Sequence, residues 1–175
     1  MPFDIFFGSL SATTAFIYAS PFGLVALFFF TLAANATILF PVLVEPIVLA
    51  VGAFAPDPFT ALFIGIITGT ASAIGEMSGY ILGLLGVKTL QKMGKTQVEK
   101  IFEIGESLAN KGIPIIFLGA FTPFPFDLLG IAAGLIKYDP KRFFLATLGG
   151  KLLRYVLIAM AGFYGLVWFR PLLGL

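Results

Sequence analysis

Long apolar segments dominate the chain, and one charged segment interrupts them. Residues 21–38 are apolar over nearly the length, about 20 residues, that crosses a bilayer as a helix. Residues 57–86 and 139–169 are longer, and each begins with Asp-Pro, a pair typical of helix starts because Asp caps the first turn and Pro fits its first position. Residues 88–111 carry five lysines and three glutamates, with apolar residues at helical spacing. This pattern predicts an amphipathic helix outside the bilayer or on its surface.

Two further apolar segments are interrupted by proline and are similar to each other. Residues 41–58 align without a gap with residues 123–140, with five identical positions and with Glu45 opposite Asp127. Proline removes a backbone donor and breaks a helix, so each segment is expected to form a helical hairpin. Interrupted apolar segments at corresponding places in two halves of a chain indicate a transporter's binding site. The residues expected to shape the hairpins, with the glycines as turn or close-packing positions, are Pro41, Pro46, Gly52, Pro123, Pro125 and Gly134.

The distribution of charge favours hairpins that turn back over segments that cross. If residues 113–136 crossed the membrane, the basic residues from Lys137 onward would lie opposite the lysines of 88–111. If they turn back, both basic segments share one face, which the positive-inside rule makes cytoplasmic. The lysine-free loop 55–57 then lies on the other face. We therefore expect hairpins 39–55 and 113–136 to enter from opposite sides, with their tips close together at mid-membrane.

The sequence predicts a single all-α integral membrane domain over residues 1–175. Its expected architecture is an inverted repeat with two oppositely oriented re-entrant helical hairpins plus about three to four spanning helices. Repeat 1 covers about residues 21–86 and repeat 2 about residues 113–169. Residues 3–19 have the pattern of an interfacial or tilted helix, and whether they cross decides the side of the amino terminus.

Composition supports the membrane interpretation and narrows the chemistry. Apolar residues make up 59% of the chain and charged residues 11%, with a mean hydropathy of +1.03. About a quarter of the residues in a soluble domain are charged, so we expect a multi-pass protein of the cell membrane. Cysteine and histidine are absent, which excludes disulfides and zinc sites of the usual ligands. We expect no metal and no cofactor, and proton chemistry must rest on carboxylates, lysine or tyrosine.

Five charged residues are expected at membrane depth: Glu45, Glu76, Asp127, Lys151 and Arg154. Because an isolated charge is costly there, the five together indicate a common polar cavity. In the functional interpretation Lys151 and Arg154 bind an anionic group, with phosphate as the best match to a guanidinium. Glu45, Asp127 and Glu76 would then take up and release protons. In the alternative interpretation these residues only pair with one another and stabilise the fold.

Two neighbouring features of residues 57–86 have mainly structural interpretations. Glycines recur at the spacing that allows close helix packing, at Gly65, Gly69, Gly75, Gly79 and Gly83. Tyr80 lies one turn beyond Glu76, so it either holds that carboxylate or anchors the helix at the interface.

Three stretches together resemble the DedA family, also called VTT or SNARE-associated Golgi domain proteins, in its TVP-like small prokaryotic branch. These are residues 41–52, the Gly75-Glu76…Tyr80…Gly83 element and residues 121–154. The resemblance implies two oppositely oriented re-entrant hairpins and a role in lipid movement. In this family that means recycling of polyprenyl-phosphate carriers or scrambling of phospholipids, with proton coupling proposed for some members.

The resemblance also assigns individual positions. Glu45 is similar to the acid of the family's first hairpin and Glu76 to the acid that follows the glycine. Two arginines of the family's second hairpin correspond here to Ala120 and Phe126, and Asp127 stands beside the second of them. Any positive charge for an anion must then come from Lys151 and Arg154, with Lys141 and Arg142 at the entrance.

The leading functional prediction is a transporter that moves a phosphate-bearing lipid, a polyprenyl phosphate or a phospholipid head group, between leaflets, with protons coupled through the hairpin carboxylates. An energy-independent phospholipid scramblase is the first alternative, and a small-ion or drug exporter is the second. We expect neither an enzyme nor a nucleic-acid partner, and a homo-oligomer is compatible with the sequence. Helix 88–111 is predicted to be cytoplasmic.

Overall fold

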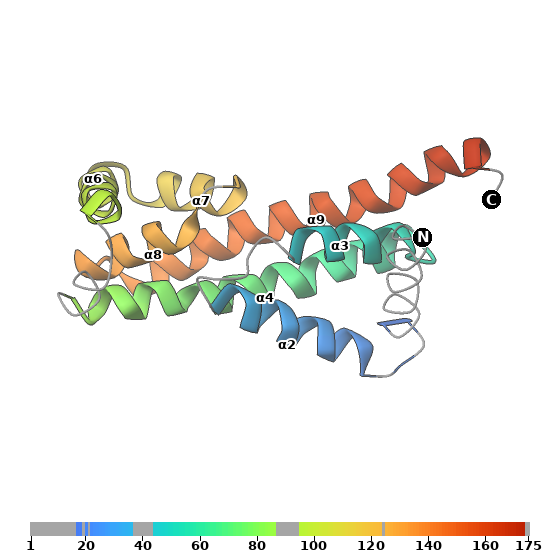
Figure 1. The fold of residues 1–175 in the computed structure, drawn as a ribbon, viewed down its shortest axis with the longest axis horizontal. Coiled ribbons are helices and arrows are strands. Elements are labelled where there is room, and N and C mark those ends of the chain that lie inside the picture. The colour runs from blue at the N-terminus through green and yellow to red at the C-terminus, as the bar shows by residue number, and fades with distance from the viewer. Residues whose placement is uncertain are drawn as a thin grey trace.

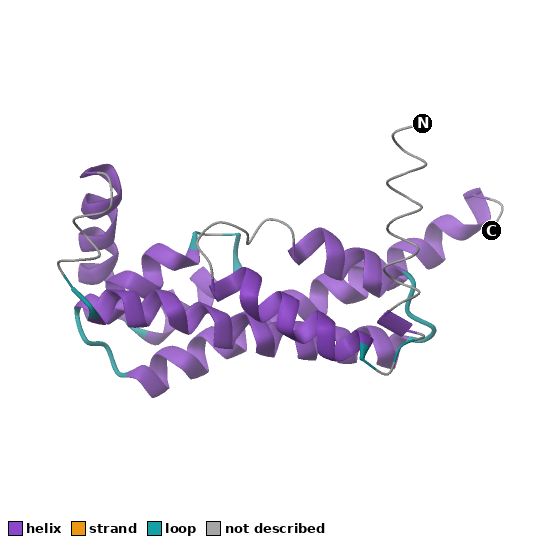
Figure 2. Cartoon of the chain, turned by 60° about the horizontal axis from the view of Figure 1, so that its bottom comes forward, coloured by secondary structure: helices purple, strands orange, loops and turns teal. Residues whose placement is uncertain are grey.

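The computed structural model describes residues 17–18, 20, 22–36, 44–86, 95–123 and 125–173. This part of the chain is all-helical, with no strand (Figure 2). The helices are α2 (Gly23–Ala36), α3 (Val44–Ala53), α4 (Pro58–Leu84), α6 (Lys95–Lys111), α7 (Ile113–Phe121), α8 (Phe126–Leu135) and α9 (Pro140–Leu173). The predicted interfacial helix 3–19 lies almost wholly outside the described residues.

Two long helices, α4 and α9, form the centre of the molecule and run in opposite directions (Figure 1). Their backbones approach at glycine, since Gly65 faces Val156 and Gly69 faces Leu152. Both are long and apolar enough to cross a membrane, over Pro58–Leu84 and Pro140–Gly165. The 27 residues of α4 extend over about 40 Å, so a bilayer of about 30 Å would require it to tilt.

Four short helices pack on this central pair, and the order in which they contact α4 and α9 is exchanged between the two halves of the chain. α2 packs on α4, and α3, which follows it in the chain, packs on α9. In the second half the order is reversed, because α7 packs on α9 and α8 packs on α4. Each long helix is therefore covered by one short helix from each half of the chain (Figures 1 and 2).

Glycines in the helices allow these close contacts. Gly75 lies against the backbone of α2 at Leu32, and Gly83 lies against α8, where an added Cβ would overlap the carbonyl oxygen of Ile131. The glycine pattern along α4 is thus confirmed as a packing feature that serves three neighbouring helices in turn. Gly52 and Gly134 also lie inside helices at close contacts, so the turn alternative for them is wrong.

The predicted Asp-Pro helix starts are confirmed at both long helices. Asp57 caps α4, where its Oδ1 accepts hydrogen bonds from the backbone N–H of Phe59 at 2.9 Å and of Thr60 at 3.0 Å. Its Oδ2 accepts one from the Thr60 hydroxyl at 2.6 Å. Asp139 caps α9 in the same way and accepts from the Arg142 N–H at 2.7 Å.

The Asp57 cap predicts a pH-dependent contribution to stability. The hydrogen bond from the Thr60 hydroxyl and those from the Thr60 and Phe59 N–H groups hold the pKa of Asp57 below its ordinary value. A lowered pKa in the folded state stabilises the fold above the unfolded pKa of about 3.9, and the contribution is lost as pH falls through the folded value. Asp57→Asn, which keeps an acceptor, should have a lower melting temperature than the unchanged protein near neutral pH. Melting in detergent should show this difference shrinking on acidification, and a difference that does not change with pH would contradict the argument.

The segment 21–38, expected to cross, contains α2 in its described part. Its 14 residues extend over about 21 Å, less than the about 30 Å of hydrocarbon, so a full crossing is not confirmed. Pro46, expected to interrupt a helix, instead lies in the first turn of α3, where its missing N–H removes no helical hydrogen bond. Pro41 lies outside the described residues. In the second half, Pro123 and Pro125 lie at the break between α7 and α8.

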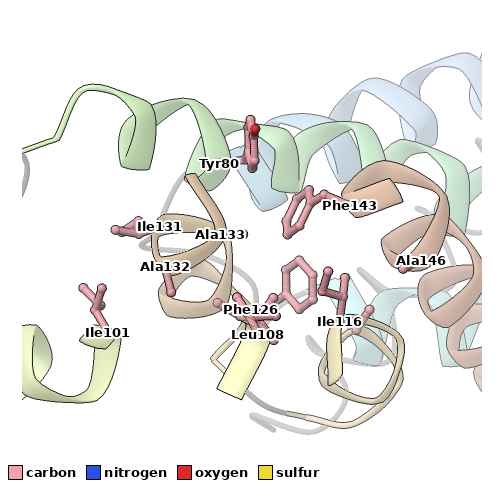
Figure 3. Close-up of a cluster of buried hydrophobic side chains, with 12 residues drawn as sticks. Tyr80, Ile101, Leu108, Ile116, Phe126, Ile131, Ala132, Ala133, Phe143 and Ala146 are labelled. Atoms are coloured by element: carbon pink, nitrogen blue, oxygen red, sulfur yellow. The ribbon is translucent and has the colours of Figure 1, made fainter. Parts of the chain in front are cut away.

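The predicted amphipathic helix is present over the described part of 88–111, as α6. Its apolar residues Ile101 and Leu108 are buried and belong to a hydrophobic cluster with residues of α7, α8 and the start of α9 (Figure 3). In the same cluster the ring of Phe143 lies 5.1 Å from that of Tyr80 and 5.9 Å from that of Phe126. The Tyr80 hydroxyl donates to the carbonyl of Tyr138 at 2.5 Å, so of its two interpretations the one in which it holds the Glu76 carboxylate is wrong.

Candidate functional site

Two cations one turn apart on α9 organise the site. Lys151 and Arg154 are spaced at i and i+3, so they lie on the same side of the helix. Both lie near the middle of α9, the long helix on which α4, α3 and α7 pack (Figure 1).

Lys151 forms a buried ion pair with Glu76 of α4. The Lys151 Nζ lies 2.6 Å from Glu76 Oε1, and the two side chains are 5% and 4% exposed. The ammonium also lies 5.3 Å from the centroid of the Phe126 ring, at the start of α8. The other carboxylate oxygen, Glu76 Oε2, is buried and has no hydrogen-bond partner among the described residues.

Arg154 contacts the helix ends of both halves of the chain. Its Nη2 donates to Oε1 of Glu45 in the first turn of α3. Its Nη1 donates to the backbone carbonyl of Thr122, at the end of α7, over 2.7 Å. This pair is more accessible than the first, because the side chains of Arg154 and Glu45 are 13% and 36% exposed.

Asp127 completes the group of five charges expected at membrane depth. It lies in the first turn of α8, is partly buried, and interacts electrostatically with Lys151 and with Glu76. The structure thus places all five around one stretch of α9. Lys141 and Arg142 are exposed at the start of that helix, about 15 Å of helix away from Lys151.

A neutral polar network beside the charged group escaped the sequence analysis. Ser72 of α4 donates to Oδ1 of Asn35 in α2 at 2.9 Å, and the Tyr155 hydroxyl of α9 hydrogen-bonds with both side chains. Tyr155 also interacts electrostatically with Glu45 and Arg154. A signal was present in the sequence: Ser72 lies four residues before Glu76 and Tyr155 four after Lys151, so each faces the same way as its charged neighbour.

The site combines three carboxylates with an ammonium and a guanidinium. No three acidic residues converge as ligands anywhere in the described ranges. Three carboxylates and two cations leave one negative charge in excess when all are ionised. Of the two cations of the site, Arg154 is the more accessible, and its planar guanidinium donors match carboxylate or phosphate oxygens.

A family model for the VTT domain matches residues 40–164, a range that contains all five charged residues. The chain belongs to the VTT domain family, the DedA/SNARE-associated family. This confirms the family that the sequence resembles. The family is membrane-associated and generally linked to membrane transport, and this VTT protein is a membrane protein. No curated protein and no solved structure matches the chain.

Proposed function

We propose that this VTT protein is a transporter of the cell membrane that moves a phosphate-bearing lipid between leaflets. The observation that carries the proposal is the meeting of helix ends from both halves of the chain at Arg154, inside a group of five charges. Buried charges on lipid-embedded helices are costly and are retained where they serve ions or substrates. A polyprenyl phosphate and a phospholipid head group share the phosphate chemistry that a guanidinium recognises.

Helix lengths support a re-entrant hairpin in the second half of the chain. α7 and α8 have nine and ten residues, about 14 and 15 Å, so neither crosses about 30 Å of hydrocarbon alone. A pair of such helices with a break between them enters and leaves on one side, which puts α6 and the basic start of α9 on the same, cytoplasmic face. The exchanged packing of α2 and α3 against that of α7 and α8 supports an inverted repeat.

The balance of charge supports proton coupling. An anion that enters a group already carrying excess negative charge is repelled unless carboxylates take up protons. Glu45 is the carboxylate that an arriving phosphate meets, because it pairs with the accessible cation. Its protonation would release Arg154 for the phosphate, and its deprotonation after transfer would recapture the arginine. Asp127 would balance Lys151 when Glu76 is protonated.

Passive scrambling is the main alternative. The Glu45 side chain is 36% exposed, which is enough for a lipid head group to reach the Glu45–Arg154 pair without any proton step. A small-cation exporter is favoured by one observation, the excess negative charge of the site. Both alternatives predict that phosphate is not specifically required.

Transport in liposomes separates these functions. With the protein reconstituted, a fluorescent phosphatidic acid should change leaflet faster under an imposed pH gradient, as followed by chemical quenching of the outer leaflet. Glu45→Gln and Asp127→Asn should abolish the stimulation by the gradient, whereas Glu106→Gln, on the exposed side of α6, should not. Arg154→Met should weaken binding of the lipid.

Three results would contradict the proposal. Equal rates with and without the gradient, for lipids with and without a phosphate group alike, would indicate a scramblase. Unchanged lipid binding by Arg154→Met would remove the anion site. Gradient-dependent movement of a cation with no lipid movement would indicate the exporter.

A further inference from the structure

Arg154 stands between two helix ends of opposite polarity. Thr122 caps the carboxyl end of α7, where free carbonyls favour a cation, and Glu45 lies in the first turn of α3. One guanidinium satisfies both groups at once, with a different nitrogen for each. The two bonds differ in strength, because the carboxylate is charged and the carbonyl is neutral.

These two helices come from different halves of the chain and are held mainly through α9. α3 and α7 each pack on α9, at Ala159 and Gly162 for α3 and at Gly149 and Gly150 for α7. Direct packing between α3 and α7 is slight or absent. Arg154 is therefore a polar link that connects the start of one helix to the end of the other.

The link is placed where a ligand can reach it. Arg154 and Glu45 are partly exposed, and Thr122 is exposed. In the ion pair one turn away, the side chains of Lys151 and Glu76 are both buried. A phosphate group that approaches the site thus meets the guanidinium that holds α3 and α7, and does not meet the buried ammonium.

We infer that Arg154 is a latch, and that one phosphate group opens it by taking the guanidinium from the Glu45 carboxylate and the Thr122 carbonyl together. This inference rests on the proposed function for its ligand. A phosphate presents several charged oxygens to the planar donors of arginine, so it competes with both acceptors at once. Release of both bonds frees the start of α3 and the end of α7 in the same event. The ligand class is an anion with a phosphate group, carried by a lipid or free in solution.

The latch itself can be tested without any ligand. The chain has no cysteine, so spin labels attach only at cysteines that are introduced for the purpose. Leu49 on α3 and Leu118 on α7 are 45% and 55% exposed, and nitroxides on Leu49→Cys and Leu118→Cys report the separation of the two helices. In dodecylmaltoside micelles, which contain no phosphate group, pulsed electron paramagnetic resonance should give a narrow distance distribution. Arg154→Gln should broaden it and extend it to longer distances.

The matched control is Arg142→Gln, the same substitution at an exposed position of the same helix, which should leave the distribution narrow. Arg154→Lys keeps the positive charge but loses the planar pair of nitrogens that donate to Glu45 and Thr122, so it should also broaden the distribution. Its helix content and melting temperature should stay close to those of the unchanged protein. A narrow distribution in both Arg154 variants would overturn the latch, whether or not the protein transports lipid.

The ligand step is tested on the labelled protein with Arg154 in place. Phosphatidic acid added to the micelles should shift the distribution toward that of Arg154→Gln, and inorganic phosphate in the buffer shows whether the free ion suffices. A shift with the lipid alone assigns the latch to a lipid head group, and a shift with both assigns it to phosphate in general. No shift with either probe would overturn the opening by phosphate, while broadening in Arg154→Gln would still support the mechanical link.

Discussion

Replacing Lys151 by methionine should lower the free energy of unfolding by about 3–5 kcal/mol, the usual cost of breaking a buried ion pair by removing one partner. The side chains of Lys151 and Glu76 are almost fully buried, and Oε2 of Glu76 already lacks a hydrogen bond within the described structure. Removal of the Lys151 ammonium, which lies 2.6 Å from Oε1, would also deprive that buried oxygen of its ion-pair partner. Chemical denaturation in detergent, followed by circular dichroism, measures the loss.

Two further variants establish that the pair is responsible. Lys141→Met makes the same change at an exposed position on the same helix and should alter stability by no more than about 0.5 kcal/mol. The double variant Lys151→Met with Glu76→Leu should recover most of the loss, because an apolar pair of similar volume often replaces a buried ion pair without cost. If Lys151→Met unfolds at the same denaturant concentration as the unchanged protein, the pair does not stabilise the fold.

The sequence predicts the helices well where the signal is local. Asp57 and Asp139 mark helix starts because capping involves only the next three residues. The amphipathic pattern of α6 is equally local. A proline alone does not predict a helix break, because it interrupts a helix at one place in this chain and fits the first turn of a helix at another. Pro123 lies in a break and Pro46 lies inside α3.

The grouping of charges is predictable from physics, but their pairing is not. Isolated charges are costly in lipid, so five of them in this chain must meet. The alignment of Glu45 with Asp127 suggests equivalent roles, yet Glu45 pairs with Arg154 whereas Asp127 acts on Lys151 only electrostatically. The pairing of Glu45 depends on the register of α3 against α9. That register is set by contacts such as Gly52 with Ala159, which are distant in sequence.

Gly134→Ala should lower the free energy of unfolding by about 1–3 kcal/mol or more, because the added methyl group overpacks a contact between two helices. A Cβ at this position would overlap the carbonyl oxygen of Tyr80 and lie 2.8 Å from both the Cα of Gly83 and the backbone nitrogen of Leu84. All three are backbone atoms of α4, so no side chain can turn aside, and α8 must move away from α4. Thermal unfolding of the variant in detergent measures the loss.

Gly165→Ala is the matched control, because a Cβ there meets no atom within 4 Å and alanine favours a helix over glycine by about 0.5–1 kcal/mol. It should be neutral or slightly stabilising. Since α8 begins with Phe126 and Asp127 beside Lys151, its displacement in Gly134→Ala should also reduce lipid transport, while Gly165→Ala should keep it. Equal stability and transport in the two alanine variants would mean that the close approach of α8 to α4 does not hold the charged group in place.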